Sequence, residues 1–181
     1  MKTPSILAMA VSAMLLSTGA QAAAPAISGN FGSGSVVGTV AAESYSFLGN
    51  ADNWSFWTFS APWQSEVSIT VSPNESELDI VFAVWYGTES DTANYFDMVS
   101  GSLNSVLVAG MDLNGNGVAE SLKFVNDYGS GRFTLAIADY QDELGFGQLG
   151  YTITAQVPEP GSWALMLGGI ALLAGIARRR T

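Results

Sequence analysis

Hydrophobic and polar residues alternate with a period of two through the middle of the chain. In one such run Val67, Ile69 and Val71 point to one side, and Ser68 and Thr70 point to the other. β-Branched and aromatic residues dominate these runs, and clusters of Gly, Asn, Asp and Pro separate them. Nothing in this region repeats apolar residues at helical spacing for three turns. The pattern therefore predicts strands and no helix.

We expect nine short strands, at residues 36–40, 44–48, 54–59, 67–72, 79–85, 105–109, 121–125, 132–138 and 150–156. Near-regular spacing of this kind favours an all-β fold, a single β-sandwich or jelly-roll-like domain of eight or nine strands over residues 36–156. The run from Ile80 to Trp85 is apolar at every position, which predicts a central strand. The alternation places further residues in the core: Leu122, Phe124, Phe133, Leu135, Ile137, Tyr151 and Ile153. Residues 24–35, rich in Ala, Pro, Gly and Ser, are expected to form a flexible lead-in.

The first 23 residues have the composition of a signal peptide. Lys2 provides a positive start, an apolar stretch follows, and Ala20-Gln21-Ala22 forms an Ala-x-Ala cleavage site. We expect residues 1–23 to form a signal helix that is removed after export. An uncleaved membrane anchor is the alternative.

The last 25 residues, 157–181, contain a second apolar run. Pro158, Glu159 and Pro160 precede an uncharged stretch at 163–177, and three arginines close it: Arg178, Arg179 and Arg180. The stretch is 15 residues long, whereas a full span needs about 20, so a short transmembrane helix is expected. The arginines would stop transfer and remain in the cytoplasm, with the body of the precursor facing the periplasm.

This order of elements resembles the PEP-CTERM sorting signal of exported bacterial proteins. The resemblance implies recognition by an exosortase, a membrane-embedded cysteine protease that cuts near the Pro-Glu-Pro element at 158–160. Prolines lack a backbone donor and hold the chain extended, as a protease cleft requires. An ordinary single-pass anchor with a proline-rich linker is the alternative.

The body resembles pre-peptidase C-terminal-like domains. The segments that carry this resemblance, in order, are Asn50–Phe56, Leu78–Trp85, Gly129–Ile137 and Gly150–Ile153. The resemblance implies an accessory β-sandwich without catalysis of its own.

Composition excludes several classes of function. The chain has no cysteine and no histidine, which removes disulfides, Cys or His metal ligands, and His-dependent nucleophiles. Residues 24–157 hold 15 acidic and two basic residues, a formal charge of −13. Such a surface does not favour nucleic acid, because phosphate affinity comes from Lys and Arg.

One loop has a calcium-binding pattern. Oxygen ligands at alternate positions and a glycine at the sixth resemble the first half of an EF-hand loop, with the candidate ligands Asp112, Asn114, Asn116, the Val118 carbonyl and Glu120. The twelfth position holds Lys123, where a bidentate Glu belongs. A plain hairpin turn is the alternative, since Asn-Gly pairs satisfy positive φ.

Two further groups of residues suggest chemistry. Asp139, Asp142 and Glu143 are close enough in sequence to suggest a pair of glycosidase carboxylates, but we expect them to form a solvated acidic loop. Four tryptophans would form a sugar-stacking platform if exposed: Trp54, Trp57, Trp63 and Trp85. Trp54 and Trp57 lie on opposite faces of one strand, whereas Trp63 follows Pro62 in a turn.

Together these features predict an exported surface or extracellular-matrix protein that is sorted through its tail. Its expected role is structural or adhesive, linked to exopolysaccharide and biofilm, and not enzymatic. A calcium-dependent carbohydrate-binding module is the alternative, and a hydrolase comes third. The expected partners are an exosortase, the membrane before processing and exopolysaccharide.

Overall fold

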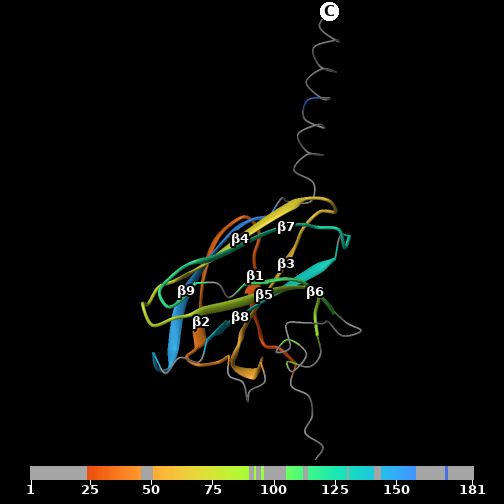
Figure 1. Ribbon diagram of the computed structural model, residues 1–181. Helices are drawn as coiled ribbons and strands as arrows, with labels where there is room; N and C mark the ends of the chain where they lie inside the picture. The colour runs from red at the N-terminus through yellow and green to blue at the C-terminus, as the bar shows by residue number, and fades with distance from the viewer. Residues whose placement is uncertain are drawn as a thin grey trace, which may run out of the picture.

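The computed structural model describes residues 24–45, 51–89, 92, 95, 105–111, 114–129, 131–140, 144–157 and 170. Within these residues, nine strands form two sheets that pack face to face (Figure 1). The predicted all-β sandwich is therefore confirmed.

The first sheet has five strands, in the order β1-β3-β8-β5-β6. Their bounds are Ile27–Asn30 (β1), Ser55–Ser60 (β3), Arg132–Asp139 (β8), Ile80–Gly87 (β5) and Ser105–Met111 (β6). All pairs are antiparallel except β1 with β3, which is parallel. A short 3-10 helix, Ala51–Asn53, precedes β3.

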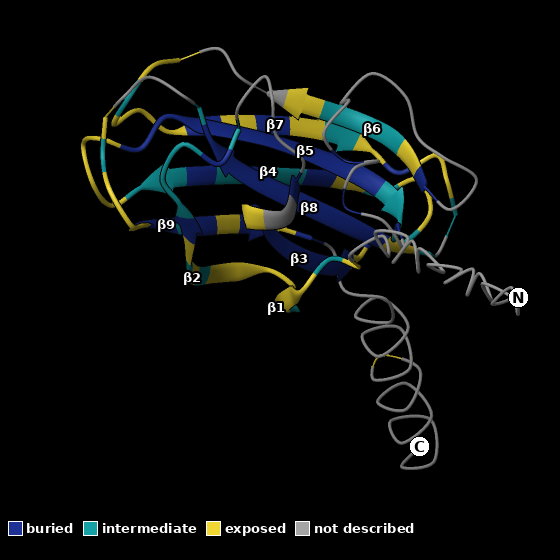
Figure 2. Ribbon diagram, turned by 90° about the horizontal axis from the view of Figure 1, so that it is seen from below, coloured by how far each residue is buried: buried dark blue, intermediate teal, exposed yellow. Residues whose placement is uncertain are grey.

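The second sheet has four antiparallel strands, in the order β2-β9-β4-β7. Their bounds are Gly34–Ala41 (β2), Gln148–Gln156 (β9), Glu66–Pro73 (β4) and Glu120–Val125 (β7). Figure 2 shows β5 and β8 buried along their length, whereas β1 and β2 lie at the more exposed sheet edges.

Two segments differ from the expected strands. Residues 27–30, placed in a flexible lead-in, form β1, which adds to the free edge of β3. The period-two pattern could not reveal this strand because main-chain hydrogen bonds to β3, and not an apolar face, define it. At the predicted strand 44–48, Tyr45 forms an isolated β-bridge with Tyr140 and no named strand includes it, and residues 46–50 lie outside the described part.

The main core lies between the sheets. It includes these alternating residues predicted from the sequence, which are buried: Val67, Ile69, Val71, Leu122, Phe133, Leu135, Ile137, Tyr151 and Ile153. Phe124, also predicted from the alternation, is partly buried and packs against this core. Phe59 and Phe133 stack within it, with ring centroids 5.0 Å apart. This filled interior is the main source of the stability of the sandwich.

A second apolar cluster covers the outer face of the five-stranded sheet. Trp54 and Trp85 belong to it, and Tyr95 packs edge-on against Trp85. This explains why β5 is apolar at every position from Ile80 to Trp85, since both faces of the strand are covered. Trp57, on the opposite face from Trp54, belongs to the main core. Both tryptophans are therefore buried, in two different cores.

The sandwich has two distinct ends. We call the end formed by loops 61–65 and 126–129 the tail-proximal end, because β9 finishes there, with Gln156 opposite Ser68 near the start of β4. We call the opposite end, with loops 42–45, 74–79, 114–119 and 144–147, the distal end. Main-chain hydrogen bonds tie the distal loops together, for example from Gly117 to Leu78 at 2.9 Å.

Candidate functional site

The last described residue of the body, Val157, is fixed to the sandwich. Its backbone nitrogen donates to Ser33 Oγ at 3.0 Å, and Ser33 Oγ donates to the Val157 carbonyl at 2.6 Å. Its side chain is 1% exposed and belongs to the main core. The C-terminal tail therefore leaves the body from a defined point at the tail-proximal end.

Loop 61–65 at this end presents a tryptophan to solvent. Trp63 is 63% exposed, and it sits in a tight turn in which Ser65 donates to the Pro62 carbonyl from its nitrogen at 3.2 Å and from Oγ at 2.6 Å. Gln64 adopts a φ of 58°, which residues other than Gly rarely adopt. The turn thus holds Trp63 outward at some conformational cost.

Asn126 joins this loop to its neighbour, loop 126–129. Its side chain is fully buried, and its amide nitrogen lies 2.8, 3.0 and 2.7 Å from the carbonyl oxygens of Ala61, Pro62 and Gly129. Its amide oxygen accepts from the Tyr128 nitrogen at 3.0 Å. One buried side chain therefore holds both loops in place. The sequence pattern gave no signal for it beyond a turn-forming residue.

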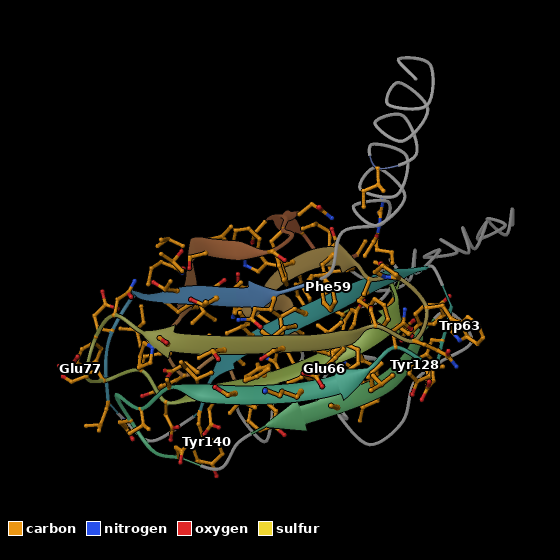
Figure 3. The ribbon with its side chains drawn as sticks, turned by 90° about the horizontal axis from the view of Figure 1, so that it is seen from above. Phe59, Trp63, Glu66, Glu77, Tyr128 and Tyr140 are labelled. Carbon is orange, nitrogen blue, oxygen red and sulfur yellow. The ribbon has the colours of Figure 1, made fainter. Side chains whose placement is uncertain are left out.

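Tyr128 is the second exposed aromatic residue at this end. It is 38% exposed and stacks on Tyr86, with ring centroids 5.3 Å apart and an interplanar angle of 24°. Tyr86 in turn packs edge-on against Phe133 of the core at 5.2 Å. Figure 3 shows Trp63 and Tyr128 close together, at the end opposite Glu77. Aromatic side chains thus extend from the core to this surface.

The two ends differ in charge. The only two basic residues between 24 and 157, Lys123 and Arg132, lie toward the tail-proximal end, because they pair with Ser68 and Ser60. The described acids at the distal end are Glu43, Glu75, Glu77, Asp79, Glu120 and Asp139. The distal end is therefore acidic, whereas positive and negative charges mix at the tail-proximal end.

The predicted calcium loop is partly described. Glu120 is 1% exposed, and its Oε1 accepts from the Asn114 nitrogen at 2.5 Å, which closes the loop as a turn. The Asn116 amide donates to the Glu77 carbonyl at 3.3 Å, and Val118 is 46% exposed. Asp112 lies outside the described residues. Among the described side chains, no group of three or more acidic residues is arranged to hold a metal ion. Calcium binding stays a prediction.

Asp139 occupies a different environment from the solvated loop that we expected. It is fully buried at the end of β8, and its Oδ1 and Oδ2 accept from the nitrogens of Asp79 and Glu43 at 2.8 and 2.7 Å. Its carboxylate is engaged in joining two distal loops, a structural role that periodicity could not reveal. Asp142 and Glu143 lie outside the described part.

The four tryptophans do not form a shared platform. Trp54, Trp57 and Trp85 are 6%, 8% and 0% exposed, which leaves Trp63 as the exposed one of the four. The N–H of Trp54 donates to the Ser44 carbonyl, and that of Trp57 to Tyr151 Oη.

Several predicted site residues lie outside the described part of the chain. These are Ala20 and Ala22 of the signal cleavage site, Pro158, Glu159 and Pro160 of the processing motif, and Arg178, Arg179 and Arg180. The expected transmembrane helix at 163–177 also lies outside it, except for Ile170. Among the described residues, no helix has the length and hydrophobicity needed to cross a bilayer.

Comparison with solved structures finds other proteins with a similar fold. The chain is similar to CorA, a surface-associated copper-binding protein of Methylomicrobium album BG8, at 13% identity and a TM-score of 0.50, over 74% of this chain and 99% of that one. It is also similar to the pre-peptidase C-terminal domain of a Bacillus anthracis collagenase, at 16% identity and a TM-score of 0.43, over 73% and 98% of the two chains. A third similar structure is PliG, a periplasmic inhibitor of g-type lysozyme from Aeromonas hydrophila, at 12% identity and a TM-score of 0.38, over 70% and 89%. At these identities the likeness concerns the fold alone.

Comparison of sequences identifies the C-terminal tail. A search of curated proteins finds no match. Residues 156–180 match the family model of the PEP-CTERM protein-sorting motif, which confirms the resemblance read from the tail. The motif implies export, a membrane-anchored precursor and processing by an exosortase. The chain therefore carries a PEP-CTERM protein-sorting motif behind an all-β sandwich.

Proposed function

We propose that this chain is a non-catalytic protein of the cell surface or extracellular matrix, with a structural or adhesive role in exopolysaccharide and biofilm. The observation that carries the proposal is the sorting motif at 156–180, which begins at the last residue of β9. The sorting signal thus joins the sandwich without a separate linker. On this proposal the tail directs sorting of the chain, and the surface of the sandwich makes the structural or adhesive contacts.

Two features support a role without catalysis. The chain has no histidine or cysteine to act as a general base or a nucleophile. The buried carboxylate of Asp139 already accepts two main-chain hydrogen bonds, so it is engaged in holding the distal loops. These observations favour a body whose polar interior groups maintain the fold.

The sorting step can be tested in a bacterial host with and without its exosortase. With the enzyme we expect a form shortened at both ends to leave the inner membrane; without it, the tail should stay attached and the chain should remain in the membrane. Replacing Pro158, Glu159 and Pro160 by alanine should block processing in the host that has the enzyme. Processing that is unchanged by either manipulation would contradict the proposal.

A calcium-dependent carbohydrate-binding module is the second candidate, favoured by the 63% exposure of Trp63. The apolar face of a sugar ring can pack on an exposed aromatic ring such as that of Trp63. The test is cosedimentation of the processed protein with the exopolysaccharide of its host, in calcium and in chelator. Binding that is lost in chelator, with Asp112→Asn and with Trp63→Ala would establish this candidate. No binding under any condition would eliminate it for that polymer.

A further inference from the structure

We infer that the tail-proximal end of the sandwich lies on the membrane surface in the anchored precursor, with Trp63 in the interfacial region of the bilayer. The inference rests on the proposed function, because it requires a membrane-anchored tail. It adds a contact between the body and lipid, and a defined orientation of the body.

The first step is the short distance between the body and the bilayer. Val157 is held by Ser33 and buried in the core, so the chain leaves the sandwich at a fixed point. The apolar run of the tail begins at Trp163, six residues later. Six residues span at most about 20 Å even when fully extended. The tail-proximal end is therefore the part of the body closest to the membrane.

The second step is the chemistry of that end. Tryptophan and tyrosine concentrate at the boundary between hydrocarbon and water, because their rings are apolar and their N–H and O–H groups remain hydrated. Trp63 is 63% exposed and Tyr128 is 38% exposed, in two loops clamped together by Asn126. Val125, at the end of β7 beside Glu66, adds an aliphatic side chain that is 49% exposed. All three side chains are exposed at the end of the sandwich from which the tail leaves.

The third step is the distribution of charge. Lys123 and Arg132 lie toward the tail-proximal end. The described acids at this end number three, Glu66, Glu89 and Asp127, whereas the distal end has six described acids. Anionic lipids attract the basic residues and repel the acidic end. The distal end also exposes apolar side chains, with Phe146 at 92% and Leu144 at 50%. They lie among acids and at the end away from the tail, which makes Phe146 a matched control.

The full chain suits site-specific labelling because it has no native cysteine. Asp127→Cys places a fluorescent label beside Tyr128, and Glu77→Cys places the same label at the distal end; each removes one exposed acid. The labelled chains are reconstituted into vesicles of phosphatidylethanolamine and phosphatidylglycerol that contain a nitroxide-labelled lipid. We expect quenching at position 127 and none at position 77. In the Asp127→Cys background, Trp63→Ala should reduce this quenching, whereas Phe146→Ala should leave it unchanged.

Flotation with the vesicles tests the membrane-anchored precursor separately from the contact between the tail-proximal end and lipid. Chains that float but show no more quenching at 127 than at 77 overturn this inference and leave the proposed function standing. Chains that float with quenching unaffected by Trp63→Ala also overturn it. Chains that do not float contradict the anchored precursor, and this inference falls with it. A label at 127 that responds to purified host exopolysaccharide, and not to lipid, would assign Trp63 to polysaccharide binding instead.

Discussion

Trp57 donates a hydrogen bond from its indole nitrogen to the hydroxyl oxygen of Tyr151, at 2.7 Å. Trp57 belongs to β3 and Tyr151 to β9, so this bond links the two sheets through the core. The same hydroxyl lies 2.5 Å from Ser55 Oγ. The sandwich therefore has a polar connection inside an apolar interior, where a lost partner would be costly.

Removing this hydroxyl should destabilise the protein. In Tyr151→Phe the Trp57 N–H and Ser55 Oγ would lose a buried partner, which costs about 1–3 kcal/mol in the free energy of unfolding. Tyr128→Phe is the matched control, because Tyr128 is exposed at the surface. Denaturant unfolding of both variants measures the difference. Equal stability of the two variants would contradict a structural role for the Trp57–Tyr151 bond.

Gly38 of β2 lies directly against the ring of Tyr151 of β9, so we expect no side chain to be tolerated at position 38. A Cβ at position 38 would lie 2.4 Å from the Tyr151 hydroxyl oxygen and 2.5 Å from Cζ. We expect Gly38→Ala to lower the free energy of unfolding by about 1–3 kcal/mol through overpacking. Gly32→Ala serves as the control, since nothing lies within 4 Å of its added Cβ. If Gly38→Ala is as stable as Gly32→Ala, the ring of Tyr151 has room to move and the packing argument fails.

Asn126→Ala should release the two tail-proximal loops. The substitution removes the amide near three carbonyl oxygens and the acceptor for the Tyr128 nitrogen, a loss of about 2 kcal/mol or more. Amide hydrogen exchange at Gln64 and Tyr128 should become faster. Asn30→Ala is the control, because the Asn30 side chain donates one partly buried bond to Thr58, at 3.2 Å. Unchanged exchange in Asn126→Ala would show that the loops are held by other contacts.

Stability should decrease at high pH. Burial raises the pKa of Tyr151 above its ordinary value of 10.0, although its hydrogen bonds to Ser55 and Trp57 oppose the shift. Below about pH 10 both folded and unfolded states keep the proton, so this group contributes its full stability there. Above pH 10 the unfolded state ionises first, and the free energy of unfolding falls until the folded pKa is reached.

The measurement is denaturant unfolding between about pH 8 and pH 11. Tyr151→Phe should show a shallower decline than the unmodified chain. Some decline should remain, because burial also raises the pKa of Tyr95 above 10.0. Identical declines in the two proteins would show that Tyr151 is not responsible.

Much of the fold could be predicted from local pattern. Val67, Ile69 and Val71 alternate because one face of β4 packs against the other sheet, and they are fully buried. The apolar run from Ile80 to Trp85 predicted a central strand, and β5 lies between β8 and β6. The edge strand β1 was missed, because its pairing depends on the free edge of β3 and not on its own side chains.

The functional candidates were less predictable. Asp139 looked like part of an exposed acidic loop, yet it is fully buried and accepts hydrogen bonds from the nitrogens of Asp79 and Glu43. Its partners are distant in sequence, so only the folded chain brings them together. The same holds for Asn126, whose acceptors include carbonyl groups 65 and 64 residues away.

The sequence by itself determined the sorting tail and the alternation that makes an all-β body, because both are encoded in contiguous residues. Only the tertiary structure decided which end of the sandwich carries the tail and which aromatic residues remain exposed. Those outcomes depend on strand order and register, which bring the start of β4, the end of β7 and Val157 to one end. Trp54, Trp57 and Trp63 are the same residue type within ten positions, and their different burial follows from this packing.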